Sequence, residues 1–211
     1  MNWSRSDLRQ SDLVHGFRPA FYKGSKNAKA TKALGDLFTL SDAMSNRSEG
    51  DLRPLLLLED ILKGTGEFAF ASQPPNRVAA GRFRVFRRGQ ILYARMRPAL
   101  NKCAFIGELF EGGHCSPEFF VLDPSPKYDP LFLTALLLSP KVNEALSNFV
   151  SGSSRPRLQW EHFAITQVEL PTAAMQKNVG AAFSSFLRNR AELHRKYGRE
   201  RQVFESVIGS L

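Results

Sequence analysis

The sequence has little cysteine and no long apolar run. Cys103 and Cys115 are its only cysteines, and they form no Cys-x-x-Cys pair. A disulfide framework and a structural zinc site are therefore not indicated, and we expect no bound metal. The longest apolar runs, LRPLLLLEDIL and LFLTALLL, are too short to cross a bilayer, and the polar start MNWSRSDLRQSDLVHG is not a signal peptide. We therefore expect a cytoplasmic protein that does not bind membranes.

The sequence also lacks the short motifs of nucleotide-dependent, metal-dependent and serine-dependent enzymes. It contains no G-x-G-x-x-G after a strand, no G-x-x-x-x-G-K-[ST], no H-E-x-x-H and no G-x-S-x-G. The four histidines, at positions 15, 114, 162 and 194, are scattered along the chain. A catalytic triad assembles in space, so this scatter does not exclude one. We expect no cofactor and no catalysis by this chain alone.

Positive charge is abundant by contrast. The 211 residues include 29 Lys and Arg against 20 Asp and Glu, giving a formal net charge of +9 and a pI near 9.9. The content of 43% hydrophobic and 23% charged residues is that of an ordinary globular protein. A basic globular chain favours a polyanionic partner, and nucleic acid is the first candidate.

The pattern of apolar residues predicts an α+β fold. Strands are expected at 82–86, 91–96, 115–124 and 165–171, and residues 1–30 are expected to form an arm lying over the domain. A helix should begin near Asp129, and Pro140 should either kink it or open a second helix. We predict a globular domain over 1–170 and a long helix over 171–211.

The last segment, after Pro171, contains no further proline and can form one coiled-coil-type helix. Its apolar residues recur every three or four positions and define a narrow stripe, here called the seam. The seam residues are Met175, Val179, Phe183, Phe186, Leu193, Tyr197, Phe204, Ile208 and Leu211. A helix of this length must find a partner helix or lie partly bare. Arg190 and Glu200 interrupt the seam, and an opposite-charge contact across an antiparallel partner could satisfy them. The alternative is a helix that breaks near Gly198 and folds back as two pieces.

Arginines cluster in two regions that precede this helix. Arg82, Arg84, Arg87 and Arg88 lie on or beside the strand RFRVF, where they either bind an anion or only keep an edge strand soluble. Further on, Arg95 and Arg97 are expected to share one face, because side chains two apart in a strand point the same way, and Pro98 should end that strand. The small residues of 152–157 would let backbone N–H groups approach a phosphate.

Three segments in order resemble one known family. The segments GQILYARMRPALNKCAF, SPEFFVLDP and SGSSRPRLQWEHFAITQVELPTAAMQ are similar to one target-recognition domain and the following helix of the specificity subunit of type I restriction-modification systems. The matching positions are Gly89, 97–102, 116–119, 152–158 and 170–176. A full subunit of that family carries two such domains and two helices. This chain is therefore either a half-subunit that pairs with itself or part of a longer protein.

The resemblance implies a non-catalytic subunit whose domain reads one half of a split DNA site in the major groove. It also implies that the helix packs antiparallel on a second such helix, and that methyltransferase and sometimes restriction subunits dock on the assembly. Arginine can hold guanine O6 and N7 together, so some arginines would read bases and others would hold phosphates. The candidate DNA contacts are Arg77, Arg82, Arg84, Arg95, Arg97, Asn101, Lys102, Ser153, Ser154, Arg155 and Arg157.

Within this set, Arg97 and Asn101 belong to the family-typical motif and could instead only fix the fold. We therefore expect the bases to be read mainly from the stretch 63–88. Two other functions stay open at this stage. One is an RNA-binding or ribosome-associated basic protein, and the other is an enzyme with an unrecognised site, such as a nuclease.

Overall fold

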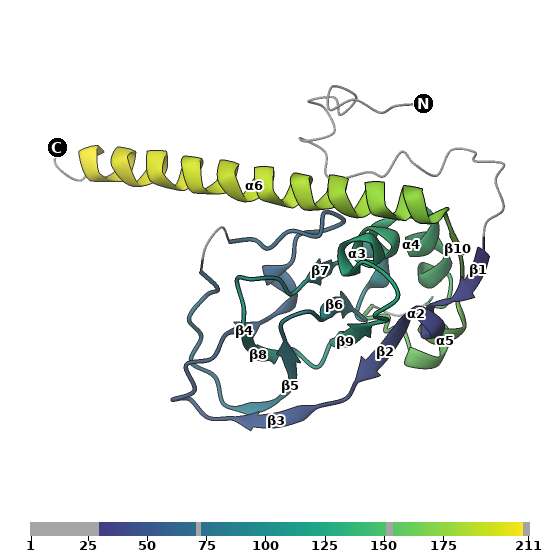
Figure 1. Cartoon of the computed structure of the whole chain (residues 1–211). Coiled ribbons are helices and arrows are strands. Elements are labelled where there is room, and N and C mark those ends of the chain that lie inside the picture. Colours follow the sequence, from purple (N-terminus) through teal and green to yellow (C-terminus); the bar gives the residue numbers. More distant parts are fainter. Residues whose placement is uncertain (1–29, 71–72, 151–153, 209–211) are drawn as a thin grey trace.

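The computed structural model describes residues 30–70, 73–150 and 154–208, with side chains as far as Tyr197. Figure 1 shows a domain of mixed strands and helices on which one long helix lies, and the fold is α+β as predicted. The predicted N-terminal arm falls almost entirely outside the described residues. The proposed division at residue 170 lies between the last strand and the long helix, and it stays a prediction.

The central sheet has the strand order β2-β9-β6-β7 and is antiparallel throughout. Its strands are β2 (Phe38–Ser41), β9 (Phe119–Pro124), β6 (Ile91–Ala94) and β7 (Cys103–Phe105). All four residues of β6 are buried because apolar side chains cover both faces of this sheet. Ile91 and Tyr93 face one hydrophobic core, and Leu92 and Ala94 face a second one. The central sheet therefore separates two cores.

A second sheet, with the order β3-β5-β8-β4, packs on the second core. Its strands are β3 (Met44–Arg47), β5 (Gly81–Arg87), β8 (Gly112–Cys115) and β4 (Leu55–Leu56). The pairs β3–β5 and β5–β8 are antiparallel, and β4–β8 is parallel. Phe86, Cys115 and Leu56 point into the second core. In Figure 1, β3 lies on the side of the domain opposite the long helix.

Short helices cover the first core. They are α2 (Leu34–Leu37), α3 (Pro130–Leu138), α4 (Pro140–Ser147) and α5 (Trp160–Ile165). The chain also forms the 3-10 turns η3 (Leu58–Asp60) and η4 (Pro98–Leu100), and Leu58 packs against the second core. The Asp129 carboxylate caps α3 by accepting from the N–H groups of Leu131 and Phe132, as the sequence predicts. Pro140 opens a second helix, because Ser139 is extended and caps α4.

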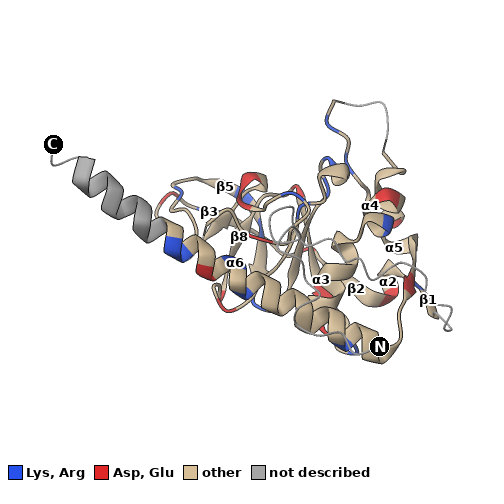
Figure 2. Ribbon diagram, turned by 90° about the horizontal axis from the view of Figure 1, so that it is seen from above, with Lys and Arg blue, Asp and Glu red and all other residues tan. Residues whose placement is uncertain are grey.

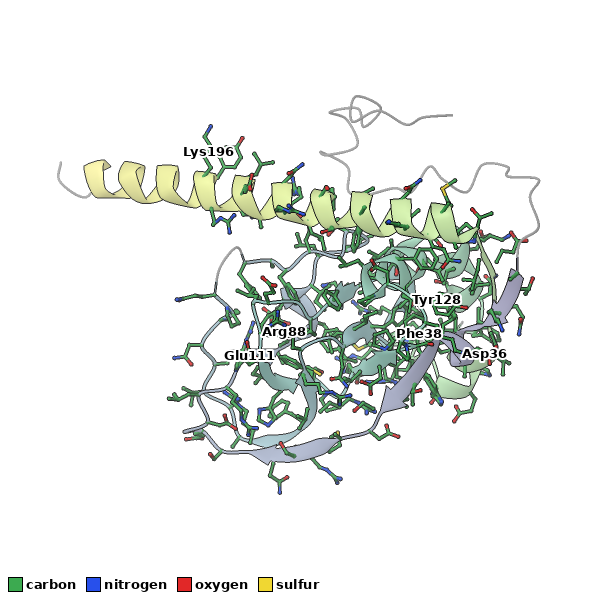
Figure 3. The ribbon with its side chains drawn as sticks, in the orientation of Figure 1. Asp36, Phe38, Arg88, Glu111, Tyr128 and Lys196 are labelled. Carbon is green, nitrogen blue, oxygen red and sulfur yellow. The ribbon has the colours of Figure 1, made fainter. Side chains whose placement is uncertain are left out.

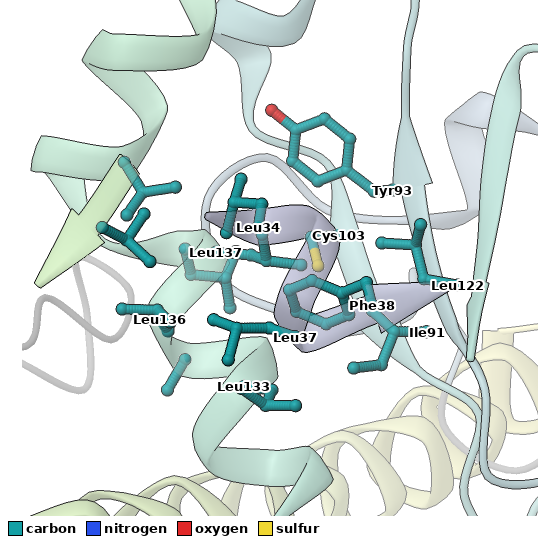
Figure 4. Packing of buried hydrophobic residues seen from close by; sticks show 14 of the residues in the cluster. Leu34, Leu37, Phe38, Ile91, Tyr93, Cys103, Leu122, Leu133, Leu136 and Leu137 are labelled. Atoms are coloured by element: carbon teal, nitrogen blue, oxygen red, sulfur yellow. The ribbon is translucent and has the colours of Figure 1, made fainter. Parts of the chain in front are cut away.

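Figure 4 shows the packing of the first core, where Leu34, Leu37 and Phe38 meet Cys103 and the leucines of α3. Phe38 and Tyr128 lie within the domain in Figure 3. Burial raises the pKa of both thiols, to about 12 for Cys115, so the two cysteines stay protonated and unreactive. Cys103 and Cys115 are packing residues.

The last elements are the strand β10 (Gln167–Leu170) and the helix α6 (Ala173–Ile208). Strand β10 pairs antiparallel with β1 (Ala30–Ala33). Helix α6 is continuous over 36 residues and passes Gly198 without a break, so the alternative of two shorter pieces is wrong. At a rise of about 1.5 Å per residue it is about 54 Å long. Its C-terminal part extends beyond the domain, and Lys196 lies on that part (Figures 1 and 3).

Candidate nucleic-acid interface

The structure brings together two groups of predicted DNA contacts that are distant in sequence. Strand β6 ends at Ala94, and the next three residues pair with the segment before α5. The N–H of Arg97 donates to the carbonyl of Pro156 at 2.8 Å, and the N–H of Leu158 donates to that of Arg95 at 2.8 Å. A bridge between Met96 and Arg157 joins the two segments. Arg95, Arg97, Arg155 and Arg157 therefore lie in one region, here called the strand-end cluster.

The prediction that Arg95 and Arg97 share a strand face is wrong. Arg97 has a φ of 52° and immediately precedes the turn η4, because Pro98 cannot continue the ladder. The Arg95 guanidinium lies 5.4 Å from the centre of the Phe120 ring and donates to the Gln159 side chain at 3.1 Å. Arg97 is exposed, and its guanidinium lies 3.5 Å from the carbonyl of Ser154.

The assignment of Asn101 as a DNA contact is corrected. Asn101 is 5% exposed, has a φ of 46°, and donates its amide to the carbonyl of Leu138 at 3.1 Å. Its neighbour Lys102 donates to the carbonyl of Leu58 at 2.6 Å. Asn101 fixes the turn η4 against α3, and Lys102 is held by the backbone of η3. This agrees with the structural interpretation of the family-typical motif.

Three predicted arginines form ion pairs within the domain. Arg157 holds Glu118 through two nitrogens at 2.7 and 3.0 Å. Arg77 contacts both carboxylate oxygens of Asp60 at 2.8 and 2.9 Å, and it also reaches Glu59. Arg84 contacts Asp42 at 3.1 Å. Asp60 is 3% exposed, so the Arg77 pair is primarily structural.

The remaining candidates are exposed or undescribed. Arg82 is the second residue of β5 and is exposed, and its guanidinium has no hydrogen-bond partner or carboxylate partner among the described residues. Ser154 and Arg155 are exposed beside Arg97. Ser153 lies outside the described residues. Figure 2 shows Lys and Arg segments across the domain from α6, near α4.

Sequence reasoning missed a buried polar network under the second sheet. The Arg47 guanidinium is 3% exposed and donates to the carbonyls of Arg53, Asp51 and Arg77 at 2.7, 2.6 and 3.1 Å. It also lies 3.3 Å from Nδ1 of His114. Burial first, together with the positive charges of Arg53 and Arg47, lowers the pKa of His114. His114 is therefore a neutral ring inside the domain.

This network resembles a serine triad but lacks its chemistry. Ser45 Oγ lies 2.7 Å from His114 Nε2, and Asp51 Oδ2 lies 3.7 Å from His114 Nδ1. The distance of 3.7 Å is too long for a hydrogen bond, and the group facing Nδ1 is the Arg47 guanidinium, which only donates. Nδ1 must then accept, so the ring proton sits on Nε2 and donates to Ser45. The histidine cannot take the Ser45 proton in this arrangement.

The first part of the predicted seam packs inside the chain. Val179, Phe183 and Phe186 are 6%, 0% and 5% exposed and belong to the first core, where Met175 also packs. Helix α6 lies along α3. Their assignment to a seam between two chains is therefore corrected, because these side chains are already covered by the domain. Leu193 and Tyr197 are 38% and 65% exposed, and the side chains of Phe204, Ile208 and Leu211 lie outside the described residues.

Arg190 also finds its partner within the chain. Its Nε donates to Oε1 of Glu67 at 2.7 Å, and Nε2 of His194 lies 3.8 Å from the same oxygen. The prediction that a partner helix neutralises Arg190 is therefore wrong. The partner of Glu200 stays a prediction, because that side chain is not described. The first part of the seam, as far as Phe186, belongs to the domain. Leu193 and Tyr197 are exposed on the last part of α6, residues 193–208, here called the overhanging part.

Among the described residues no three His, Cys, Asp or Glu side chains gather as metal ligands would. In the same residues no helix is long and apolar enough to span a membrane.

The fold of this chain, an α+β domain whose last strand leads directly into one long helix, matches solved structures of specificity subunits. The HsdS subunit of Thermoanaerobacter tengcongensis matches 88% of this chain over 48% of its own length, with a TM-score of 0.56 and 18% identity. A chain from a structure on complex assembly and conformational transition of the type I R-M system matches 87% of this chain over 48% of its own length, with a TM-score of 0.55 and 18% identity.

The S subunit of the type I restriction-modification system of M. genitalium matches 85% of this chain over 45% of its own length, with a TM-score of 0.54 and 14% identity. The resemblance indicated by the sequence motifs is therefore confirmed at the level of the fold. This chain spans about half the length of the specificity subunits that it matches. No protein-family model and no curated protein sequence matches it.

Proposed function

We propose that this chain is the DNA-recognition unit of a type I-like restriction-modification system, and that it binds one half of a split site without catalysing a reaction. The observation that carries this proposal is the fold likeness, which covers 85 to 88% of this chain and just under half of each specificity subunit. The net charge of +9 supports a polyanionic ligand. His114 is neutral, and its Nδ1 faces the Arg47 guanidinium, which only donates. This arrangement gives no support to a serine-type hydrolase.

The strand-end cluster is the proposed phosphate-binding surface. Arg97, Ser154 and Arg155 are exposed there, and Arg157 remains accessible beside Glu118. Such contacts position a protein on a duplex but carry no sequence information directly. Hydrogen bonds connect this cluster to the second sheet, because the N–H of Glu118 donates to the Ser116 hydroxyl and the N–H of Ser116 donates to the carbonyl of Leu56. The carbonyl of Leu55, the neighbouring residue of β4, accepts from Arg77.

The overhanging part of α6 is the proposed contact with a second recognition unit. Leu193 and Tyr197 are exposed on it, and the sequence continues the stripe through Phe204 and Ile208. An antiparallel pair of such helices would hold two domains at a fixed distance, so a chain that pairs with itself would read a symmetric split site. Methyltransferase and restriction subunits are the proposed further partners, and the cytoplasm is the proposed location.

The test is the binding of labelled duplex DNA to the full chain, measured by fluorescence anisotropy at several salt concentrations. The slope of log K against log salt should be about −0.9 for each phosphate neutralised. Structured RNA should compete poorly with duplex DNA of equal length. Affinity that does not depend on salt would contradict the proposal, and preference for RNA would favour the alternative of an RNA-binding protein.

The non-catalytic role is tested separately. The purified chain with DNA, magnesium and a methyl donor should neither cut nor methylate the DNA, and turnover without a partner would contradict the proposal. Co-purification from the native host should yield a methyltransferase subunit. Mapping of the methylated adenines in that host would then give the target sequence.

A further inference from the structure

Two loops beside the second sheet are tied together by one buried side chain. They are the segment 48–53, which follows β3, and the segment 73–80, which precedes β5. The Arg47 guanidinium donates to two carbonyls in the first loop, those of Asp51 and Arg53, and to the carbonyl of Arg77 in the second. Because Arg47 is almost fully buried, these hydrogen bonds are shielded from water. These hydrogen bonds hold the two loops, 48–53 and 73–80, in one fixed arrangement, here called the braced platform.

Arg53 is held on this platform by one edge of its guanidinium. Nε lies 3.1 Å from Oδ1 of Asp51, and Nη2 lies 2.6 Å from Oδ2. The Asp51 carboxylate therefore occupies the edge of the guanidinium that Nε and Nη2 form. The outer edge, formed by Nη1 and the second hydrogen of Nη2, has no hydrogen-bond partner among the described residues. The Arg53 side chain is 55% exposed and that of Asp51 is 12% exposed, so the carboxylate lies on the buried side of the guanidinium.

We propose that Arg53, positioned by Asp51, reads a guanine through O6 and N7 in the major groove, an inference that rests on the proposed function. The outer edge of a guanidinium matches the two acceptors of guanine. A phosphate would be a poorer ligand, because the Asp51 carboxylate already balances the Arg53 charge. The edge of a guanine base carries no net charge. It therefore suits the Asp51–Arg53 pair, whose charges cancel while the outer edge of the guanidinium still offers two N–H donors.

The surroundings of Arg53 supply the other chemistry of base recognition. Leu52 and Val78 are 88% and 75% exposed on the two braced loops, and apolar side chains of this kind contact the thymine methyl group. Asn46 lies opposite Arg82 in the β3–β5 pair, and both are exposed. All four residues lie at the same end of the second sheet, where β3 ends and β5 begins.

The experiment selects duplexes from a random library with the full chain and compares the enriched motifs. The wild-type protein should enrich a motif that contains at least one guanine. Arg53→Ala should lose the preference at a single guanine, repeated by symmetry if the protein pairs with itself. Binding to the wild-type motif should fall about 10- to 100-fold. Arg53→Lys should lose the same preference, because it retains the charge but not the fork.

Arg188→Ala is the matched control. Arg188 is an exposed arginine of α6, which lies on the side of the domain opposite β3 (Figure 1). It should leave the motif unchanged. If the wild type enriches a motif and Arg53→Ala enriches the same one, the inference is wrong while the proposed function stands. If the wild type enriches no motif, the proposed function itself fails. Circular dichroism checks that each variant is folded.

Discussion

Arg190 of α6 and Glu67 of the loop before β5 are joined by a 2.7 Å contact between Nε and Oε1. They lie 123 positions apart in the sequence. Glu67 is 6% exposed, so its carboxylate has little contact with water. The contact lies further along α6 than the buried Phe186, and it fixes how the helix leaves the domain. The direction of the overhanging part is therefore set by an ion pair as well as by apolar packing.

Removing Arg190 should destabilise the domain. Arg190→Ala leaves the buried Glu67 carboxylate without its main partner, so the free energy of unfolding should fall by about 1–3 kcal/mol. Urea unfolding measures the change. The double variant Glu67→Ala, Arg190→Ala should lose less than the sum of the two single losses, because the unpaired charge is then also removed. Strictly additive losses would show that the two side chains do not interact.

Replacing Phe183 should unfold the domain rather than separate two chains. Phe183 is fully buried, and Phe183→Ala should lower the free energy of unfolding by about 3–5 kcal/mol. Tyr197→Ser, on the exposed part of α6, should leave thermal stability nearly unchanged and weaken self-association. Thermal melting and analytical ultracentrifugation together distinguish these effects. A monomeric wild type, or a Tyr197→Ser variant that associates as strongly as the wild type, would contradict the proposed helix pairing.

Gly66 should not tolerate alanine. Its φ is 79°, and a Cβ there would lie 2.6 Å from Cζ of Phe183 and 3.0 Å from Cδ1 of Leu138. Gly64 is the matched control, with a φ of 68° and open space around it. Both variants carry the backbone cost of about 1 kcal/mol, and only Gly66→Ala should add about 1–3 kcal/mol for overpacking. Equal loss of stability in urea would argue against close packing of α6 on this loop.

His114 should make stability depend on pH. Its pKa is lowered in the folded protein, chiefly by burial, so the unfolded chain takes up the proton first as the pH falls. Stability from the neutral ring is present above pH about 6.5 and decreases below it, by up to about 1.4 kcal/mol per pH unit. His114→Gln should remove this part of the slope between pH 7 and pH 5 in urea unfolding. The other histidines are common to both proteins, so an unchanged slope would show that His114 titrates normally.

Local signals predicted the elements that depend on local chemistry. The Asp129 cap, the strand after Gly89 and the proline-free helix after Pro171 all follow from residues within one or two turns. Strands β7 and β8 were not predicted. Strand β8 begins with two glycines, and a Cβ on Gly113 would lie 2.6 Å from the carbonyl of Pro54. The reason for glycine there is a contact with a segment almost sixty residues earlier, which no local pattern reveals.

In the candidate site, too, the sequence predicts what depends on local residues and misses what depends on contacts between distant ones. The sequence predicts how many arginines are present, but not which carboxylate neutralises each one. Arg157 and Glu118 are 39 positions apart, and Arg77 and Asp60 are 17 apart. The Asp51–Arg53 pair is local and could have been noticed in the segment DLR. Its support by Arg47 and His114 could not, because the second sheet brings these residues together only after folding.

The pairing of β1 with β10 places Ala30 directly opposite Leu170, three residues before α6 begins. The described chain thus enters the domain beside the base of the long helix (Figure 1). A linker or affinity handle attached ahead of Ala30 would emerge at this corner. For measurements on immobilised protein, such as surface plasmon resonance, anchoring at that corner would leave the platform carrying Arg53 facing the solution.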